Sequence, residues 1–335
     1  MDQRRDLVER ADEQSRDLQE VSTWEPRTVV DRLAYVLYNA VNYGLQTIVL
    51  AVALGITLLL LVQPAVLVLE EPSLSFFFGL SVVPAALLAG FIWYTDITSS
   101  EPLSLLVATF ILAVLFATFA AVVNSAVGPV LQAIPVIGTV LFFYLIVGPV
   151  EEAVKLLAVR VFAYRSDTFD AVIDGAVYGA IAGLGFAAIE NAIYIASTVA
   201  TAEVGTITAA TGIATVRALV GPGHVIYSAI AGYYLGLAKF NPEHAGPLVA
   251  KGLLIAAFVH ATYNTTVGIV PGLVAETYAV SFELAFVGYV ILFDLVVGYY
   301  LYRKIARYRR TYRAVRDETR ASPKPELTEF DPPRR

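Results

Sequence analysis

Five ionisable side chains of this sequence lie within long apolar stretches, where a charge is costly. They are Glu151, Glu152, Glu190, His224 and His260. A charged residue at the centre of a membrane helix costs about 2.5–3.5 kcal/mol on insertion scales. Such side chains are therefore expected to be paired with one another or to bind something. Carboxylates and imidazoles together can hold a metal ion or move protons.

The composition indicates a membrane protein that crosses the bilayer several times. The chain has 335 residues, of which 57% are hydrophobic, and its mean hydropathy is +0.67. It contains no Cys, so disulfides, thiolate metal ligands and cysteine nucleophiles are excluded. The sequence has no phosphate-binding glycine loop and no basic patch of the kind that binds nucleic acid. We expect the lipid bilayer, and no nucleic acid, as a partner.

The apolar runs predict an all-α fold, a polytopic membrane bundle of about eight transmembrane helices. The charge-free run from Leu33 to Leu69 is too long for one span, so it is divided into an interfacial helix, 28–43, and a first span that starts at Gly44. The domain prediction has a charged cytoplasmic tail (1–27), this interfacial helix, an eight-helix transmembrane domain (44–302) that contains all five of these ionisable residues, and a basic, then disordered, cytoplasmic tail (303–335). The expected spans are 44–69, 73–95, 103–131, 134–164, 171–200, 213–238, 247–271 and 278–302.

The distribution of basic residues predicts the orientation in the cell membrane. Arg160 and Arg165 lie at the end of the fourth expected span and just after it. Lys239 and Lys251 lie just after the sixth expected span and at the start of the seventh. A basic cluster that begins at Arg303 follows the last span. Because Lys and Arg concentrate in cytoplasmic loops, we expect a multi-pass protein with both termini in the cytoplasm.

The fourth expected span carries the densest group of charges. Pro149 suits the first position of a restarted helix, and Glu151 and Glu152 follow it in the first turn. Lys155 is spaced to pair with either glutamate. One carboxylate could then be neutralised while the other is free for chemistry. The alternative is a purely structural ion pair beside a protonated glutamate.

The fifth expected span combines small residues with one carboxylate. Gly175, Gly179 and Gly183 recur every four residues, which is typical of close helix packing. Glu190 continues this stripe and is expected to face protein, where an interhelical hydrogen bond is the alternative to a ligand role. Asp170 and Asp174 are expected to be solvated caps at the start of the helix.

The two intramembrane histidines lie in different spans. His224 follows Gly221-Pro222-Gly223, which is expected to loosen the helix, and it shares a helix face with Arg217. Arg217 could hold a carboxylate or the substrate backbone, but an arginine that extends its charge to the membrane surface is an equal alternative. His260 and Asn264 are one turn apart on one face of the seventh span.

These motifs together resemble the PrsW family of intramembrane proteases, which is similar to the larger group that contains the CAAX prenyl proteases. The resemblance rests on Glu151-Glu152-x-x-Lys155, on Phe186-x-x-x-Glu190-Asn191 and on the separate His224 and His260. It implies an endopeptidase that acts on membrane-anchored proteins or peptides; in bacterial relatives the implied target is an anti-sigma factor. It also implies that Glu151 is the general base and that His224, His260 and Asn264 surround the reacting centre. The chain departs from the prenyl-protease group by having Glu190 where a histidine is usual.

The predicted chemistry is hydrolysis of a peptide bond by an activated water. We expect Zn²⁺ to be held by Glu190, His224 and His260. Glu151, Glu152 and Asn264 are the catalytic candidates, with Glu151 as base, Glu152 in a supporting role and Asn264 on the oxyanion. Lys155, Arg217 and Asn191 are expected to support them. An alternative mechanism has no metal and uses Glu151 and Glu190 to activate water.

Two other classes of function could use the same residues. A cation or metal transporter or channel would place these carboxylates and histidines along a water-filled path. A non-enzymatic membrane scaffold would tolerate their joint replacement by apolar residues. Cleavage of a membrane-anchored partner that stops on Glu151→Gln would distinguish a protease from both.

Overall fold

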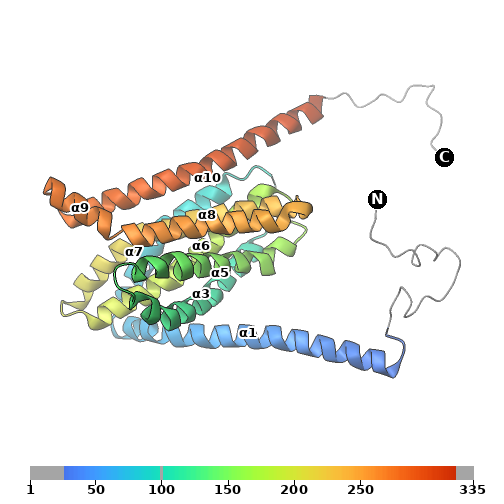
Figure 1. Cartoon of the computed structure of the whole chain (residues 1–335), viewed down its shortest axis with the longest axis horizontal. Coiled ribbons are helices and arrows are strands. Elements are labelled where there is room, and N and C mark those ends of the chain that lie inside the picture. Colours follow the sequence, from blue (N-terminus) through green and yellow to red (C-terminus); the bar gives the residue numbers. More distant parts are fainter. Residues whose placement is uncertain (1–25, 99–100, 322–335) are drawn as a thin grey trace. The chain divides into compact units, whose positions relative to one another are not determined.

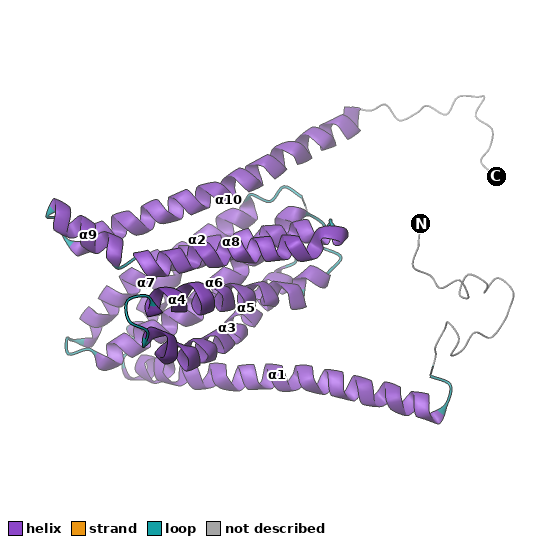
Figure 2. Cartoon of the chain, viewed as in Figure 1, coloured by secondary structure: helices purple, strands orange, loops and turns teal. Residues whose placement is uncertain are grey.

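The computed structural model describes residues 26–98 and 101–321, and within these ranges the chain is helical and contains no strand (Figures 1 and 2). The helical fold class predicted from the sequence is therefore confirmed. In chain order the elements are α1 (Val29–Glu70), α2 (Leu74–Tyr94), α3 (Leu103–Gln132), α4 (Gly138–Phe142), the π-helical turn η2 (Phe143–Val147), α5 (Gly148–Val161), η3 (Ala163–Arg165), α6 (Val172–Thr201), α7 (Thr206–Lys239), η4 (Pro242–His244), α8 (Ala245–Thr266), α9 (Ile269–Tyr278) and α10 (Phe282–Ala321).

Seven helices in the described ranges are long and apolar enough to cross a membrane. They are Thr47–Glu70, Leu74–Tyr94, Leu103–Gln132, Val172–Thr201, Thr206–Lys239, Pro242–Thr266 and Phe282–Arg316. Each corresponds to one predicted span. The chain is thus an integral, multi-pass membrane protein, and the difference from the expected eight spans concerns a single segment.

That segment, predicted as a span over 134–164, consists of three consecutive helical pieces: α4, η2 and α5. Pro149 lies in the first turn of α5. Since proline has no backbone N–H to donate, the regular hydrogen-bond ladder changes at this point, and the wider π-helical turn precedes it. The predicted restart of the helix at Gly148-Pro149 is confirmed, and none of the three pieces is a full span by itself.

Two predicted boundaries differ from the structure. The break expected at Gly44 is absent, because α1 continues from Val29 to Glu70; a single glycine costs a helix only about 1 kcal/mol. That residues 28–43 lie along the membrane interface stays a prediction. The last helix does not end at 302, since α10 continues through the basic stretch to Ala321. Most of the predicted N-terminal tail and the segment after Ala321 lie outside the described residues.

The chain divides into two units, residues 1–55 and 56–335, and every candidate site residue belongs to the second. Within this second unit α6 is the central helix. In the most apolar window of α6 78% of the residues are buried, against 17% for α10. Helix α6 therefore contacts protein on nearly all sides.

The glycine stripe of α6 packs against the backbone of α7 (Figure 1). A Cβ at Gly179 would overlap the backbone of Ser228, and one at Gly183 would lie 2.8 Å from the carbonyl carbon of His224. The predicted close-packing face is confirmed. The expected loosening at Gly221-Pro222-Gly223 is wrong, because α7 is a continuous helix with Pro222 inside it.

We expect Gly183→Ala to destabilise the protein, because the new methyl group would meet backbone that cannot move aside. Overpacking of this kind costs typically about 1–3 kcal/mol. Thermal unfolding in detergent measures the effect. Gly212→Ala in α7 is the matched control, since nothing lies within 4 Å of a Cβ there, and it should be neutral or stabilising. Equal unfolding temperatures for Gly183→Ala and wild type would contradict the close approach of the two helices.

Candidate active site

The first turns of α5 bring two adjacent glutamates into a buried position, and Lys155 pairs with one of them. The Lys155 Nζ lies 2.7 Å from Oε1 of Glu152, and both side chains are fully buried. Ser228 of α7 donates a longer hydrogen bond of 3.3 Å to the other oxygen of Glu152. Glu152 is therefore a neutralised, structural carboxylate, and Glu151 is the glutamate that Lys155 leaves unpaired.

Glu151 has one oxygen bound and one without a partner. Asn124 of α3 donates through Nδ2 to Oε1 of Glu151 over 2.9 Å. The second oxygen, Oε2, is buried and has no hydrogen-bond partner among the described residues. It lies 3.7 Å from Nε2 of His260, which is too far for a hydrogen bond. Because a buried carboxylate oxygen without a partner is costly, this atom is suited to contact a proton, a water or a metal ion.

The orientation of His260 is fixed by Glu152. The Nδ1 atom of His260 lies 2.9 Å from Oε1 of Glu152, the same oxygen that accepts from Lys155. Since this carboxylate is ion-paired and only accepts, Nδ1 carries the proton and donates. In the neutral ring, Nε2 then presents its lone pair toward Glu151. A carboxylate behind the histidine is the arrangement that orients imidazole ligands in metal sites.

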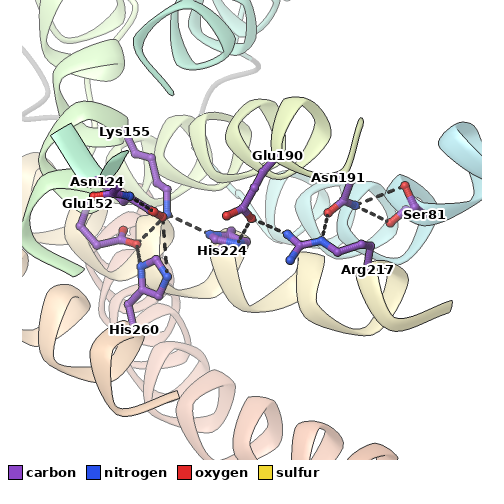
Figure 3. Close-up of polar contacts among 10 residues, drawn as sticks. Ser81, Asn124, Glu152, Lys155, Glu190, Asn191, Arg217, His224 and His260 are labelled. Atoms are coloured by element: carbon purple, nitrogen blue, oxygen red, sulfur yellow. Dashed lines mark hydrogen bonds and ion pairs between the residues drawn. The ribbon is translucent and has the colours of Figure 1, made fainter. Parts of the chain in front are cut away.

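His224 bridges the two halves of the polar network (Figure 3). Its Nδ1 lies 3.0 Å from the Nζ of Lys155, and its Nε2 lies 2.9 Å from Oε2 of Glu190. Because an ammonium group can only donate, Nδ1 is the acceptor and Nε2 donates to Glu190. Both ring nitrogens of His224 are therefore already engaged.

Glu190 is held by Arg217, which connects the site to α2. The guanidinium of Arg217 donates to Oε2 of Glu190 and, through Nε, to Oδ1 of Asn191 over 2.7 Å. Asn191 donates in turn to the backbone oxygen of Ser81 over 3.0 Å (Figure 3). Arg217 therefore holds a carboxylate, as one of the two alternatives predicted, and it does not extend toward the membrane surface.

These side chains surround a cavity of about 460 Å³. Its lining includes Glu151, Glu190, Arg217, His224, His260 and Asn264. Glu152 and Lys155 do not line it. The predicted group of site residues is thus brought together from α5, α6, α7 and α8, with the Glu152–Lys155 pair behind the wall. Asn264 lies in the wall one turn from His260, as their spacing predicted.

The potential metal ligands differ from the predicted set by one residue. Among the described residues, Glu151, His224 and His260 each offer a ligand atom within 4.8 Å of the other two. The predicted set had Glu190 in place of Glu151. Two imidazoles and one carboxylate are a donor set of catalytic zinc sites, and the unpartnered Oε2 of Glu151 fits such an ion. His224 would exchange one of its present contacts for the metal.

Three features were missed or misjudged at the sequence level. The partner of Glu151, Asn124, was missed, although a lone asparagine in an apolar run is a detectable signal. Asp174 is not a solvated cap: it is fully buried and accepts hydrogen bonds from the backbone N–H of Asp170 and Ala171. Asp174 also lies near two further carboxylates, Asp96 and Glu101.

Fold and site together define a polytopic membrane protein with a buried cavity of acidic and imidazole groups. The sequence model of the family described as "PrsW family intramembrane metalloprotease" matches residues 101–296. The chain therefore belongs to the PrsW family and is an intramembrane protease. This assignment does not favour the transporter or channel alternative.

Individual relatives agree with this assignment. "Protease PrsW" of Geobacillus kaustophilus is 32% identical over 189 residues, which cover 55% of this chain and 76% of the relative. "Protease PrsW" of Halalkalibacterium halodurans is 27% identical and covers 55% and 80%, respectively. The protein of the same name from Bacillus subtilis is 31% identical over 129 residues, or 38% of this chain and 54% of the relative. No solved structure matches the chain significantly.

We expect Glu152→Gln to destabilise the fold, because it leaves the buried ammonium group of Lys155 without its carboxylate. Breaking a buried ion pair from one side costs about 3–5 kcal/mol. Thermal unfolding and the yield of folded protein in detergent measure the loss.

The matched control removes both charges. Glu152→Gln combined with Lys155→Met should recover a large part of the lost stability, since neither charge then stays buried alone. A double variant that is less stable than the single one would contradict this view of the pair.

Proposed function

We propose that the chain hydrolyses a peptide bond of a membrane-anchored protein in the cavity, and that Glu151 activates the attacking water. The observation that carries this proposal is the unpartnered, buried Oε2 of Glu151, which lies 3.7 Å from His260 Nε2. Peptide hydrolysis needs a base for the water and stabilisation of the charge on the tetrahedral intermediate. The cavity contains groups suited to both.

Each side chain has a separate task in this proposal. Glu151 takes the proton of the water, and Asn124 holds its carboxylate in position through the 2.9 Å hydrogen bond. His224, His260 and the amide of Asn264 surround the reacting carbonyl. The Asn264 amide would donate to the developing oxyanion, and His260 would do so once its Nε2 has taken up a proton. Glu152 and Lys155 orient the two histidines from behind. Arg217 and Asn191 fix Glu190 against His224.

A resident metal ion, for which Zn²⁺ is our proposal, would supply Lewis-acid polarisation and a more acidic water. Glu151, His224 and His260 are the side chains within reach of such an ion. We propose this trio in place of the ligand set predicted from the sequence, which contained Glu190 instead of Glu151, because Arg217 already neutralises Glu190. In the absence of a metal, Glu151 would act as the base, and the Asn264 amide together with a protonated His260 would stabilise the developing charge.

The substrate class follows from the position of the cavity. The cavity lies among membrane-spanning helices, and its wall includes apolar side chains of α3, α6 and α7. A peptide that reaches it is therefore expected to come from a membrane-anchored protein, and its cleavage would release a soluble portion. This is the chemistry of regulated intramembrane proteolysis.

We expect Glu151→Gln to abolish detectable cleavage of a membrane-anchored reporter, since loss of a general base typically lowers the rate about 10²–10⁴-fold. Folded yield should stay near wild type, because Gln can still accept the hydrogen bond from Asn124. Glu203→Gln, outside the cavity, is the control. Retained cleavage in Glu151→Gln would refute its role.

Elemental analysis of the same purified variants tests the metal proposal. Wild type should contain about one equivalent of zinc if the three ligands form one site. The content should fall in His224→Ala, in His260→Ala and in Glu151→Gln, and it should persist in Glu190→Gln. Loss of metal in Glu190→Gln with retention in Glu151→Gln would instead favour the set that contains Glu190.

We further propose that both termini lie in the cytoplasm, with α4, η2 and α5 together completing an eighth crossing. The basic residues Arg160, Arg165, Lys239 and Lys251 then fall on one side of the membrane.

Because the chain lacks Cys, single introduced cysteines report the topology directly. An impermeant thiol reagent applied to intact cells should label a cysteine at Glu203, in the external loop, and not one at Ala321. Labelling at Ala321 before lysis would overturn this orientation.

A further inference from the structure

Three carboxylates meet at a second place, remote from the cavity. Asp96 follows α2, Glu101 precedes α3, and Asp174 lies in the first turn of α6. One oxygen of each lies within 4.8 Å of the others. Glu190 lies sixteen residues beyond Asp174 on the same helix, or about 24 Å at 1.5 Å per residue. This acidic cluster is therefore separate from the active site.

Hydrogen bonds orient two of the three carboxylates. Asp174 Oδ2 accepts from the backbone N–H of Asp170 and Ala171 over 2.8 and 2.9 Å. Asp96 Oδ1 accepts from the backbone N–H and the hydroxyl of Thr98 over 2.8 and 2.7 Å. In both Asp96 and Asp174, one carboxylate oxygen thus accepts hydrogen bonds from the protein. The other oxygen is left for a different partner, apart from a long 3.4 Å contact between Thr98 and Asp174 Oδ1.

The remaining oxygens include several that are buried without any partner. Glu101 is only 5% exposed, and neither of its carboxylate oxygens has a hydrogen-bond partner among the described residues. The Oδ2 atom of Asp96 is in the same state. A buried carboxylate with no donor is rare in native proteins and indicates an absent ion or water.

The basic residues near the cluster form no direct ion pair with it. Among the described residues, no Lys or Arg is paired with any of the three carboxylates, although the charge of Lys239 interacts with Asp174 at longer range. Lys239 donates instead to the backbone oxygens of Tyr164 and Ser166. The three carboxyl groups therefore crowd together without a directly paired basic side chain among the described residues.

We propose that Asp96, Glu101 and Asp174 bind one divalent cation of the hard, oxygen-preferring class, Ca²⁺ or Mg²⁺. All three donors are carboxylates, with the Thr98 hydroxyl nearby, and such all-oxygen sets are the ones these ions select. The hydrogen bonds to Asp96 and Asp174 pre-orient the ligands, as outer partners do in known metal sites.

The bound ion would join the connection between α2 and α3 to the start of α6. Its three ligands come from the ends of three different elements, so it would fix their relative positions in the way a covalent cross-link does. In the orientation proposed above, this end of α6 faces the cytoplasm, where divalent cations are available. The proposal does not depend on the hydrolytic mechanism.

Calorimetric titration of the full chain in detergent, after removal of bound metal by a chelator, tests the proposal. Ca²⁺ is the first probe because it binds imidazole poorly, so the catalytic cavity competes little; Mg²⁺ is titrated in parallel. We expect saturable binding near one equivalent for at least one of the two ions. A ligand that binds only the folded state raises the unfolding temperature, so this temperature should increase by several degrees at saturation.

Glu101→Gln is expected to differ from wild type in opposite directions without and with the cation, when thermal stability is measured. Without cation it should be as stable as wild type or more stable, since it removes one of three crowded carboxyl groups and leaves a neutral amide of nearly the same shape. With cation it should show at least tenfold weaker binding and little thermal shift, whereas Glu203→Gln should behave as wild type. Absence of saturable binding of both ions in wild type, or equal binding in Glu101→Gln, would overturn the proposal.

Discussion

The close contact between α6 and α7 is the constraint on which the site depends. Without side chains at Gly179 and Gly183, the two helix backbones approach so closely that a methyl group would overlap the opposite chain. Within a membrane, where lipid solvates apolar side chains as well as protein does, such contact of small residues is a main source of helix association. It places Glu190 of α6 directly opposite Arg217 and His224 of α7. The same stripe continues from the start of α6 toward the catalytic end.

The charged side chains of the site largely neutralise one another in pairs. Seven charged or ionisable groups are gathered from four helices, yet most have found a partner. Lys155 satisfies Glu152, and Arg217 satisfies Glu190, while the histidines connect the two pairs. What is left over is a single carboxylate oxygen of Glu151, beside one imidazole nitrogen. In the proposed mechanism this carboxylate oxygen carries the reactivity, because the other carboxylates of the site are already engaged.

The sequence predicted the elements better than it predicted the contacts between them. The limits of the long apolar runs were close to those of the helices, because bilayer thickness and helical rise fix the length of a span. The start of a new helical segment at Gly148-Pro149 could be predicted because it depends only on the missing backbone N–H of the proline. By contrast, neither the choice of Glu152 as the partner of Lys155 nor the trio of Glu151, His224 and His260 could be read from spacing. Both depend on the rotation and tilt of helices that are far apart in the chain. Asn124 could have been noticed as a lone asparagine in an apolar run, but its pairing with Glu151 depends on the same rotation and tilt.

The broken segment α4–η2–α5 has a consequence for how the protein is made. Glu151, Glu152 and Lys155 make this segment a poor candidate for membrane insertion by itself, since each charge at its centre costs several kcal/mol. Lys155 and Glu152 pair within α5 itself, and Asn124 of the earlier α3 holds Glu151. The remaining partners, Ser228, His224 and His260, belong to α7 and α8, which the ribosome produces later. The proposed site is therefore complete only once α8 has been synthesised, and a chain that is still emerging lacks it.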